Sequence, residues 1–507
     1  MNFFISENIF SFNSGTEHAQ IKRTKLFNAF NDAAKYVTRN YNRLLDRDLK
    51  AVGLTPDVVL NMYDFFQGTT DIKRVEQNLR LLKMLPLDTY HIVADGPNQS
   101  FLNHNGRRIA TITVMPETVG LVNEVIFEDR AGNPTIRENW DWRGFKSSVD
   151  TFHPDGSLAT QRFLNLNGDV VLEITHMAIN GLVQPTMWQL LNYRGHHYRF
   201  NSENELLTFF LNEIVKKYQE ATLISDRRTL DEAVGKVSGA KQKFAYFHDI
   251  HTPDVVQPRL GEPYPVYEIA LSQKNQLFDA ILVPTDAQRH DIKARYPNLN
   301  VKTAPDTFIS QSMLTQSQTS IRNRVNHRIL FLGRLSPEKN PEAAVQVLSV
   351  TRRYVNDATL EFMGYPANTE IVQKLQQLAR DLGVESSVIF TPYGNYEAVK
   401  EALSRAQVII ETSHGEGFGM NLVEALAFGL PIVSYRINYT TTTHEIVENN
   451  RNGYVVPTAS ANIMAQRVAS ILNDPSKWAS MSTASYQKAK FFSAEKIYNV
   501  WQQVFKN

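Results

Sequence analysis

Short apolar runs alternate with amphipathic stretches through the last third of the chain. Apolar residues cluster at 328–332, and apolar positions with a helical spacing follow at 341–354. The same alternation predicts strands at 359–363, 388–391, 408–411 and 431–435, and helices at 370–382, 397–406 and 421–428. Because strands that alternate with helices form βαβ units around a buried parallel sheet, we expect a doubly wound α/β domain over residues 313–485.

The beginning of the chain and the stretch after residue 205 show a similar pattern. Residues 2–5 predict a strand, and a polar loop and a helix at 16–30 follow it. Farther along, the pattern predicts a helix at 205–218 and strands at 221–224, 244–247 and 280–283. We therefore predict a second Rossmann-like domain, formed by residues 1–75 together with residues 205–312.

Residues 76–204 carry a different pattern, in which polar and apolar positions alternate between closely spaced turn signals. Alternating segments lie at 108–114, 122–127 and 170–175, and turn sequences lie at 132–134, 154–156, 167–168 and 180–181. This pattern indicates an antiparallel β-meander inserted into the N-terminal α/β domain. An independent β domain between two α/β domains is the alternative.

Composition narrows the class of protein. The 507 residues include 53 Lys and Arg against 52 Asp and Glu, so the formal net charge is +1, which excludes a general polycation and predicts no nucleic-acid partner. The absence of cysteine excludes disulfides, thiolate zinc sites and thiol nucleophiles. The N-terminus lacks a basic signal-peptide region, and no apolar run reaches the about 18 residues of a membrane span. We therefore expect a cytoplasmic protein with several domains.

Two carboxylates, Glu416 and Glu424, lie eight positions apart where a predicted strand passes into a helix. Glu416 belongs to a Gly-rich loop, and Glu424 lies about one turn into the helix. Ligands of parallel sheets bind at such crossovers, and exposed amides at a helix start favour a phosphate. One carboxylate could then hydrogen-bond a sugar and the other a ribose. The alternative is that Glu424 is a buried cap partner and Glu416 a turn residue.

A second strand-to-helix loop in the same domain supplies two cations. Gly333, Arg334 and Lys339 follow the strand predicted at 328–332. Arg334 and Lys339 could neutralise a leaving diphosphate at the edge of the sheet that also carries Glu416. Taken alone, either cation is more often a solvated surface charge. The combination of both cations with the two acids in one domain points more specifically to a site that binds a diphosphate.

These residues resemble the Arg/Lys and Glu-x7-Glu signatures of retaining glycosyltransferase family four, whose members have the GT-B fold of two Rossmann-like domains facing a cleft. The resemblance implies that Arg334 and Lys339 bind the phosphates of a nucleotide-sugar donor. It also implies that Glu424 binds the ribose and that Glu416 faces the transferred sugar. Further donor-binding positions implied by the resemblance are Gly15, Gly333, Gly364, Tyr393, Gly417, Phe418, Gly419, Asn421 and Leu422.

The N-terminal half narrows the resemblance to one bacterial branch. Residues 13–20, residues 61–66 and the β insertion look like the serine-rich and serine-aspartate-repeat adhesin glycosyltransferases and the poly(glycerol-phosphate), or wall teichoic acid, α-glycosyltransferases. In this branch Gly15 would let its backbone approach a phosphate, although an ordinary turn glycine is the alternative. The resemblance also implies that residues 313–485 bind the nucleotide sugar and that a C-terminal helix within 486–507 returns to the N-terminal, acceptor-side domain.

Two histidines follow the strand predicted at 244–247. In the family, a histidine at this position lies near the transferred sugar, so the resemblance assigns His248 to the catalytic residues, with a core or surface histidine as the alternative. His251 has no assigned role, and metal binding by the pair lacks a third ligand. The resemblance implies no metal and no cofactor besides the UDP-sugar substrate. Glu445 lies in a loop that departs from the family pattern, which leaves its role open, and Thr442 or Thr443 could cap the following helix.

The resemblance implies transfer of glucose or N-acetylglucosamine from a UDP-sugar with retention of configuration, and Glu416 is not expected to be a covalent nucleophile. We rank serine hydroxyls of a serine-rich surface protein first as the acceptor, and poly(glycerol- or ribitol-phosphate) wall teichoic acid second. A non-catalytic acceptor-binding partner and a storage-polysaccharide synthase are the rivals. We expect the β insertion to bind the acceptor or to build a homo-oligomer or hetero-complex. We expect the protein to lie in the cytoplasm or at the inner face of the membrane. Cations that would serve an acidic acceptor are Lys22, Arg23, Lys25, Arg107 and Arg108.

Overall fold

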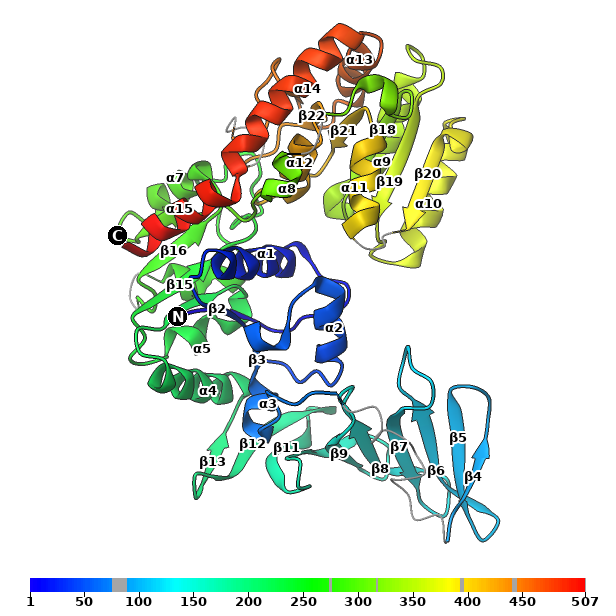
Figure 1. The fold of residues 1–507 in the computed structure, drawn as a ribbon, viewed down its shortest axis with the longest axis vertical. Coiled ribbons are helices and arrows are strands. Elements are labelled where there is room, and N and C mark those ends of the chain that lie inside the picture. Colours follow the sequence, from blue (N-terminus) through cyan, green and yellow to red (C-terminus); the bar gives the residue numbers. More distant parts are fainter. Residues whose placement is uncertain (75–88, 273–275, 316–317, 393–395, 440–444, 507) are drawn as a thin grey trace. The chain divides into compact units, whose positions relative to one another are not determined.

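The computed structural model describes residues 1–74, 89–272, 276–315, 318–392, 396–439 and 445–506 (Figure 1). Contacts between Cα atoms divide the chain into two compact units, residues 1–243 and residues 244–507, and each is described by itself. The domain boundaries expected from the sequence differ from this division and stay a prediction. Within the described ranges, no helix has the length and apolar character needed to cross a membrane.

A parallel sheet forms the α/β part of the first unit. Its strands pair in the order β14-β1-β2-β3, and apolar side chains of β1 are fully buried. Phe4 of β1 packs edge-on against Phe27 of helix α1, with ring centroids 5.3 Å apart. The elements are β1 (Asn2–Ser6), α1 (Gly15–Ala29), β2 (Ala34–Thr38), α2 (Leu45–Val52), β3 (Val59–Asn61), α3 (Met62–Gln67), α4 (Glu203–Lys217), β14 (Thr222–Ser225) and α5 (Asp231–Gly235).

Ten antiparallel strands form a meander in which each strand pairs with its neighbours in sequence, within the range predicted as an insertion (Figure 1). Gly156 and Gly181, predicted as turn residues, have φ of 82° and 80°, a conformation that glycine adopts without a Cβ clash. The strands are β4 (His91–Ala94), β5 (Gln99–His104), β6 (Arg107–Val114), β7 (Val122–Glu128), β8 (Pro134–Trp140), β9 (Lys146–Phe152), β10 (Leu158–Leu164), β11 (Val170–Ile179), β12 (Leu182–Tyr193) and β13 (His196–Phe200).

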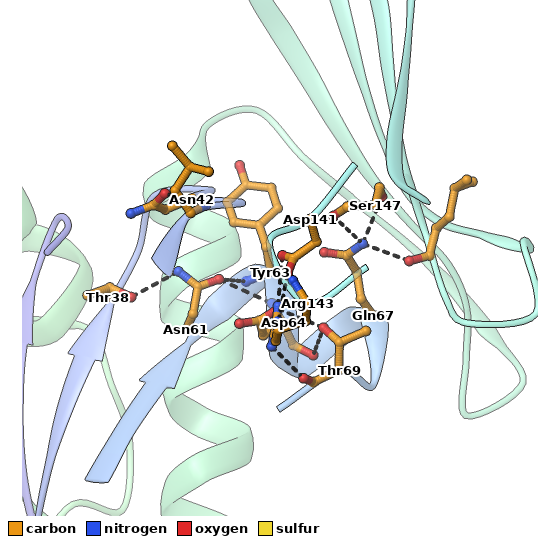
Figure 2. A network of polar contacts seen from close by, with 12 residues as sticks. Thr38, Asn42, Asn61, Tyr63, Asp64, Gln67, Thr69, Asp141, Arg143 and Ser147 are labelled. Atoms are coloured by element: carbon orange, nitrogen blue, oxygen red, sulfur yellow. Dashed lines mark hydrogen bonds and ion pairs between the residues drawn. The ribbon is translucent and has the colours of Figure 1, made fainter. Parts of the chain in front are cut away.

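A buried polar network joins the meander to helix α3 (Figure 2). Arg143, in the turn between β8 and β9, donates to the Asp141 carboxylate at 2.7 Å and to the Asp64 carboxylate at 2.7 Å. The same guanidinium donates to the carbonyl oxygen of Thr69 at 2.8 Å. Gln67 of α3 donates to the carbonyl oxygen of Ser147 at 2.9 Å. The motif at 61–66 therefore attaches the β-sheet to the α/β part of the first unit.

Three parallel strands begin the second unit, in the order β15-β16-β17, and the C-terminal helix packs on them. The Phe505 ring stacks on Phe244 at 5.6 Å, and the Trp501 ring contacts Tyr246 at 5.6 Å. The Lys302 ammonium donates to the carbonyl oxygen of Val504 at 2.8 Å. The elements are β15 (Gln242–Tyr246), α6 (Glu268–Leu271), β16 (Ala280–Val283), α7 (Asp286–Arg295), β17 (Val301–Thr303), α8 (Gln311–Leu314) and α15 (Ala494–Lys506).

Six further parallel strands form a separate sheet that lies wholly in this unit, in the order β20-β19-β18-β21-β22-β23, and helices pack on it. The order reverses between β18 and β21, as in a doubly wound sheet. The strands are β18 (Arg328–Leu332), β19 (Thr359–Gly364), β20 (Val388–Pro392), β21 (Val408–Glu411), β22 (Ile432–Tyr435) and β23 (Gly453–Val456). The helices are α9 (Pro341–Thr351), α10 (Thr369–Asp381), α11 (Tyr396–Arg405), α12 (Met420–Ala427), α13 (Ala461–Leu472) and α14 (Pro475–Ala489).

Candidate active site

Two loops that follow neighbouring parallel strands carry predicted catalytic charges. Strands β18 and β21 are paired in parallel, so loop 333–340 and loop 412–419 leave the same edge of the sheet. The Lys339 ammonium forms an ion pair with the Glu416 carboxylate, and about a fifth of each side chain is exposed (21% and 20%). The Thr412 hydroxyl donates to the Lys339 carbonyl oxygen at 3.2 Å, which holds the two loops together. The structure thus brings one predicted cation and one predicted acid into contact.

Arg334, the other predicted cation, pairs with a carboxylate of its own loop. Its guanidinium forms an ion pair with Glu338, and 44% of the Arg334 side chain is exposed. The carbonyl oxygen of Glu338 accepts a hydrogen bond from the backbone N–H of His414 at 2.9 Å. Arg334 therefore lies on a loop that is itself fixed to the loop of Glu416.

The Glu411 carboxylate forms hydrogen bonds that hold the loop after β21. No role was predicted for this residue from the sequence. Its buried carboxylate accepts hydrogen bonds from the backbone N–H of Ser413 at 3.1 Å and from the side-chain amide of Asn421 at 3.0 Å. The same Asn421 amide donates to the Leu332 carbonyl oxygen at 2.8 Å. Asn421, predicted to bind the donor, thus uses its side chain to tie α12 to β18. The position of Glu411 as the last residue of a predicted strand was the feature of the sequence that could have marked it as a site residue.

Glycines allow the loop after β21 to lie directly against the loop after β15. A Cβ atom on Gly417 would fall 2.1 Å from the carbonyl oxygen of His248, and one on Gly415 would fall 3.0 Å from the Ile250 side chain. Real Cβ atoms do not approach a carbonyl oxygen so closely, because the electron shells repel each other. The predicted catalytic residues His248 and Glu416 therefore lie on adjoining loops of one compact unit.

His248 is held by a buried aspartate. Its Nδ1 atom lies 2.8 Å from a carboxylate oxygen of Asp306, and both side chains are under a tenth exposed (7% and 5%). The Tyr246 ring meets the imidazole edge-on at 4.3 Å, and the Tyr246 hydroxyl donates to the carbonyl oxygen of Ala304 at 2.6 Å. Asp306 was not predicted as a site residue from the sequence, although it follows the short strand β17 (Val301–Thr303).

His251 lies in a buried cluster beside these loops. Burial, with the charge of Arg295, lowers the pKa of His251 to about 4, so its imidazole is neutral near pH 7. Its ring stacks on Tyr439 at 5.9 Å, and the Tyr439 hydroxyl donates to Asp291 of α7 at 3.1 Å. Across the described ranges, no group of three or more His, Cys, Asp or Glu side chains is arranged to hold a metal ion.

Glu445, whose role the sequence left open, contacts the start of helix α7. Its carboxylate accepts a hydrogen bond from the backbone N–H of Asp286 at 3.3 Å. Burial raises the pKa of Glu445 to about 7, and the nearby carboxylate of Asp286 adds to that rise. Thr442 and Thr443, the predicted capping residues, lie outside the described residues.

The other predicted donor-binding residues occupy three kinds of place. Glycines stand where the backbone turns sharply or another chain segment approaches: Gly419 precedes α12 with φ of 86°, and a Cβ on Gly364 would fall 1.9 Å from the Gly333 carbonyl oxygen. Phe418 and Leu422 bury their side chains, and the backbone N–H of Leu422 donates to the Gly419 carbonyl oxygen at 3.0 Å. Three predicted residues remain. Glu424 is half-buried in α12, and Gly15 is the first residue of α1 in the first unit. Tyr393 lies outside the described residues.

Comparison with known families identifies the region that contains most of these residues. Residues 316–488 match the family model described as "Glycosyl transferases group 1". The chain carries a group 1 glycosyltransferase domain. This domain holds Arg334, Lys339, Glu416 and Glu424, the four charged positions that the sequence analysis singled out.

Full-length relatives of this chain come from both parts of the predicted bacterial branch. The UDP-N-acetylglucosamine–peptide N-acetylglucosaminyltransferase GtfA subunit of Streptococcus gordonii is 21% identical, over 97% of this chain and 96% of the relative. The poly(ribitol-phosphate) α-N-acetylglucosaminyltransferase of Staphylococcus aureus is also 21% identical, over 97% of this chain and 96% of the relative. The resemblance to this branch of glycosyltransferases is confirmed.

A solved structure shows the same fold. The crystal structure of the pneumococcal O-GlcNAc transferase GtfA in complex with UDP and GlcNAc superposes with a TM-score of 0.83. The match covers 100% of this chain and 98% of that chain, at 17% sequence identity. The predicted GT-B fold with a separate antiparallel sheet is therefore confirmed.

Proposed function

We propose that the enzyme transfers N-acetylglucosamine or glucose from a UDP-sugar to serine hydroxyls of a serine-rich surface protein, with retention of the anomeric configuration. The observation that carries the proposal is the Lys339–Glu416 ion pair at the carboxyl edge of the β18–β23 sheet. The pair joins a cation and an acid from two strand-to-helix loops, and the backbone of His248 lies against Gly417, the next residue after Glu416. A leaving diphosphate needs the cation, and a sugar hydroxyl needs the acceptor oxygens of the acid.

In the proposed reaction, the bond between the anomeric carbon and the donor phosphate oxygen breaks, and a bond to the acceptor oxygen forms on the same face of the sugar. Lys339, Arg334 and the backbone amides at the start of α12 neutralise the charge that gathers on the leaving UDP. The departing phosphate oxygen takes the proton of the acceptor hydroxyl. Glu416 accepts a hydrogen bond from the sugar and forms no covalent intermediate.

The names of the relatives guide the choice of donor and partner. The two relatives described above are named as N-acetylglucosaminyltransferases, so UDP-N-acetylglucosamine is the first donor in the proposal and UDP-glucose the second. The Streptococcus gordonii relative is named as a subunit, which supports a hetero-complex as the working form of this chain. The proposal keeps the cytoplasmic location expected from the sequence, with association at the inner face of the membrane as its extension.

A second candidate acceptor is a poly(glycerol- or ribitol-phosphate) chain, which the Staphylococcus aureus relative favours by its name. The cations expected to meet such a polyanion are largely engaged within the protein. Arg23 is buried in an ion pair with Asp226, and Arg108 pairs with Glu128 at 3.0 Å. A buried, paired guanidinium cannot reach a polymer, so Arg23 is not expected to contact this acceptor, whereas the Arg108 side chain stays 47% exposed.

The decisive experiment supplies radiolabelled UDP-N-acetylglucosamine or UDP-glucose, with a serine-rich peptide or with poly(glycerol phosphate), to the wild type and to Glu416→Gln. We expect label in the peptide, and a loss of about 100-fold or more in the variant. Glu448→Gln is the matched control, because Glu448 also pairs with a lysine, Lys488 at 2.9 Å, in the same unit. Label in the polymer alone would replace the first acceptor by the second. If the protein binds UDP but neither transfers the sugar nor hydrolyses the donor, the alternative of a non-catalytic, acceptor-binding partner is favoured instead.

A further inference from the structure

The loop after β17 approaches the loop after β15 through one pair of side chains. Asp306 and His248 face each other with 2.8 Å between a carboxylate oxygen and Nδ1, and both side chains are almost fully buried. A carboxylate only accepts hydrogen bonds, so the Nδ1 atom must carry the hydrogen that joins the pair. In the neutral imidazole this fixes the tautomer and places the acceptor lone pair on Nε2.

The surroundings of the pair hold it rigidly. The Tyr246 ring meets the imidazole edge-on, and its hydroxyl bonds to the backbone at Ala304, two residues before Asp306. The backbone N–H of Ile309, three residues after Asp306, donates to the carbonyl oxygen of Phe492 at 2.7 Å. The backbone is therefore held by hydrogen bonds both before and after Asp306, and the Asp306 carboxylate in turn holds the imidazole of His248. Neither ring rotation nor a tautomer change is possible without breaking a buried charge-assisted hydrogen bond.

We propose that Asp306 is a positioning residue for the transfer reaction, which holds His248 in the tautomer whose Nε2 atom accepts a hydrogen bond from a hydroxyl group of the transferred sugar. This inference rests on the proposed function, because it assumes that a sugar donor binds beside the loop of His248. Asp306 itself touches no substrate in this mechanism. It acts on the sugar only through His248, as the buried aspartate of a serine protease acts through its histidine.

The opposing explanation is that Asp306 only stabilises the fold. The chain offers a matched control, because His327 and Asp357 form a second pair through the same atoms, with Nδ1 2.5 Å from a carboxylate oxygen. This second pair lies at the amino-terminal ends of β18 and β19, the opposite edge from the catalytic loops. Asp306→Asn and Asp357→Asn thus remove the same charge from contacts through the same atoms, one almost fully buried and the other partly exposed (21% for His327 and 55% for Asp357).

The activity test measures turnover of the UDP-sugar, the dissociation constant of UDP and the melting temperature for the complete chain. We expect Asp306→Asn to lower kcat by about 10- to 100-fold. The dissociation constant of UDP should stay within about threefold, because the proposed contact of His248 is with the transferred sugar and not with UDP. Asp357→Asn should match the wild type in all three measurements. A fall in UDP affinity and melting temperature that accounts for the lost turnover would show a structural role and overturn the proposal, as would unchanged turnover in Asp306→Asn.

A double-mutant cycle separates action through His248 from direct action. His248→Gln alone should lower turnover at least as much as Asp306→Asn does, and adding Asp306→Asn to His248→Gln should cause no further loss. A further loss of about tenfold or more in the double variant would mean that Asp306 acts by another route, which contradicts the proposal.

Nuclear magnetic resonance of the protein labelled with 15N-histidine tests the tautomer without any substrate. The signals of His248, assigned by their absence in His248→Gln, should show a hydrogen on Nδ1 in the wild type. A hydrogen on Nε2 alone would overturn the inference even in an active enzyme. If the wild type transfers no sugar from any UDP-sugar, the proposed function fails, whereas the tautomer result still decides whether Asp306 sets the state of His248.

Discussion

Gly417 lies against the backbone of His248 so closely that a Cβ atom on Gly417 would sit 2.1 Å from the His248 carbonyl oxygen. The contact sets the spacing between the loop that carries Glu416 and the loop that carries His248. Gly415 makes a similar but looser approach, because its Cβ would meet the flexible end of Ile250 at 3.0 Å. The two glycines thus form a matched pair for substitution.

Gly417→Ala is expected to lower transfer strongly, because the added methyl group pushes apart two loops of the proposed site. A displacement of about 1 Å at a reacting centre costs on the order of 100-fold in rate. Gly415→Ala should cost less than about tenfold, since the Ile250 side chain can change its rotamer. Steady-state kinetics with a UDP-sugar compare the two variants, and equal losses in both would contradict this account of the contact.

Replacement of Lys339 by methionine keeps most of the side-chain volume and removes the charge that pairs with Glu416. We expect kcat to fall by about 100- to 1000-fold, the range for loss of one group that stabilises developing charge. Lys488→Met removes the same charge from the pair with Glu448 and should leave kcat within about threefold. Similar kinetics for the two variants would show that Lys339 serves only the fold.

Arg143→Leu is expected to destabilise the first unit, because it leaves the Asp141 and Asp64 carboxylates without their shared cation (Figure 2). Removal of one partner from a buried ion pair costs about 3 to 5 kcal/mol. Arg162→Leu breaks the exposed pair with Glu173 and should cost at most about 1 kcal/mol. Differential scanning calorimetry distinguishes the two variants, and equal melting temperatures would refute a stabilising role for the network.

Glu445 gives the protein a predicted dependence of stability on pH. Its pKa is about 7 in the folded chain against 4.5 for the free side chain, so the folded state binds the proton more tightly. Stability therefore falls as pH rises from about 4.5 to about 7, and the loss is complete above that window. Glu445→Gln should raise the melting temperature at pH 8 and change it little at pH 4.5.

Glu448→Gln should behave in the opposite way, which provides the control for the pH experiment. The hydrogen bond from Lys488 lowers the pKa of Glu448, so its ionised form stabilises the fold. This contribution is present above the unfolded pKa and is lost as pH falls through the folded one. A melting-temperature difference between Glu445→Gln and the wild type that is the same at pH 4.5 and pH 8 would contradict the Glu445 prediction.

Periodicity alone predicted the repeating elements of the chain. The strand expected at 328–332 is β18, and the strand expected at 408–411 is β21, because their apolar runs face packed helices on both sides. The edge strand β23 (Gly453–Val456) went unpredicted, since four residues carry too little pattern. Its Gly453 stands where a Cβ would fall 1.9 Å from the Ile432 carbonyl oxygen, a constraint that only the packed sheet reveals.

The candidate site was predictable only in part, because single residues carry no periodicity. Lys339 and Glu416 stood out by their loops and their resemblance to a family, and the structure joins them. Asp306 and Glu411 each follow or end a short strand, but many acids do so, and only the hydrogen bonds reveal what these two hold. The burial of His251 likewise depends on Tyr439, which is far away in sequence.

Helix α15 comes long after strand β15 in the sequence, yet it packs against it. Phe505 and Trp501 cover Phe244 and Tyr246, and Tyr246 in turn supports the backbone next to Asp306. Domains usually fold in order as they emerge during synthesis. Here Phe244 and Tyr246 of β15 stay uncovered until α15 has been synthesised. The order of the His248–Asp306 pair therefore depends on a helix far away in sequence, and removal of residues 494–506 is expected to loosen the pair by uncovering Tyr246.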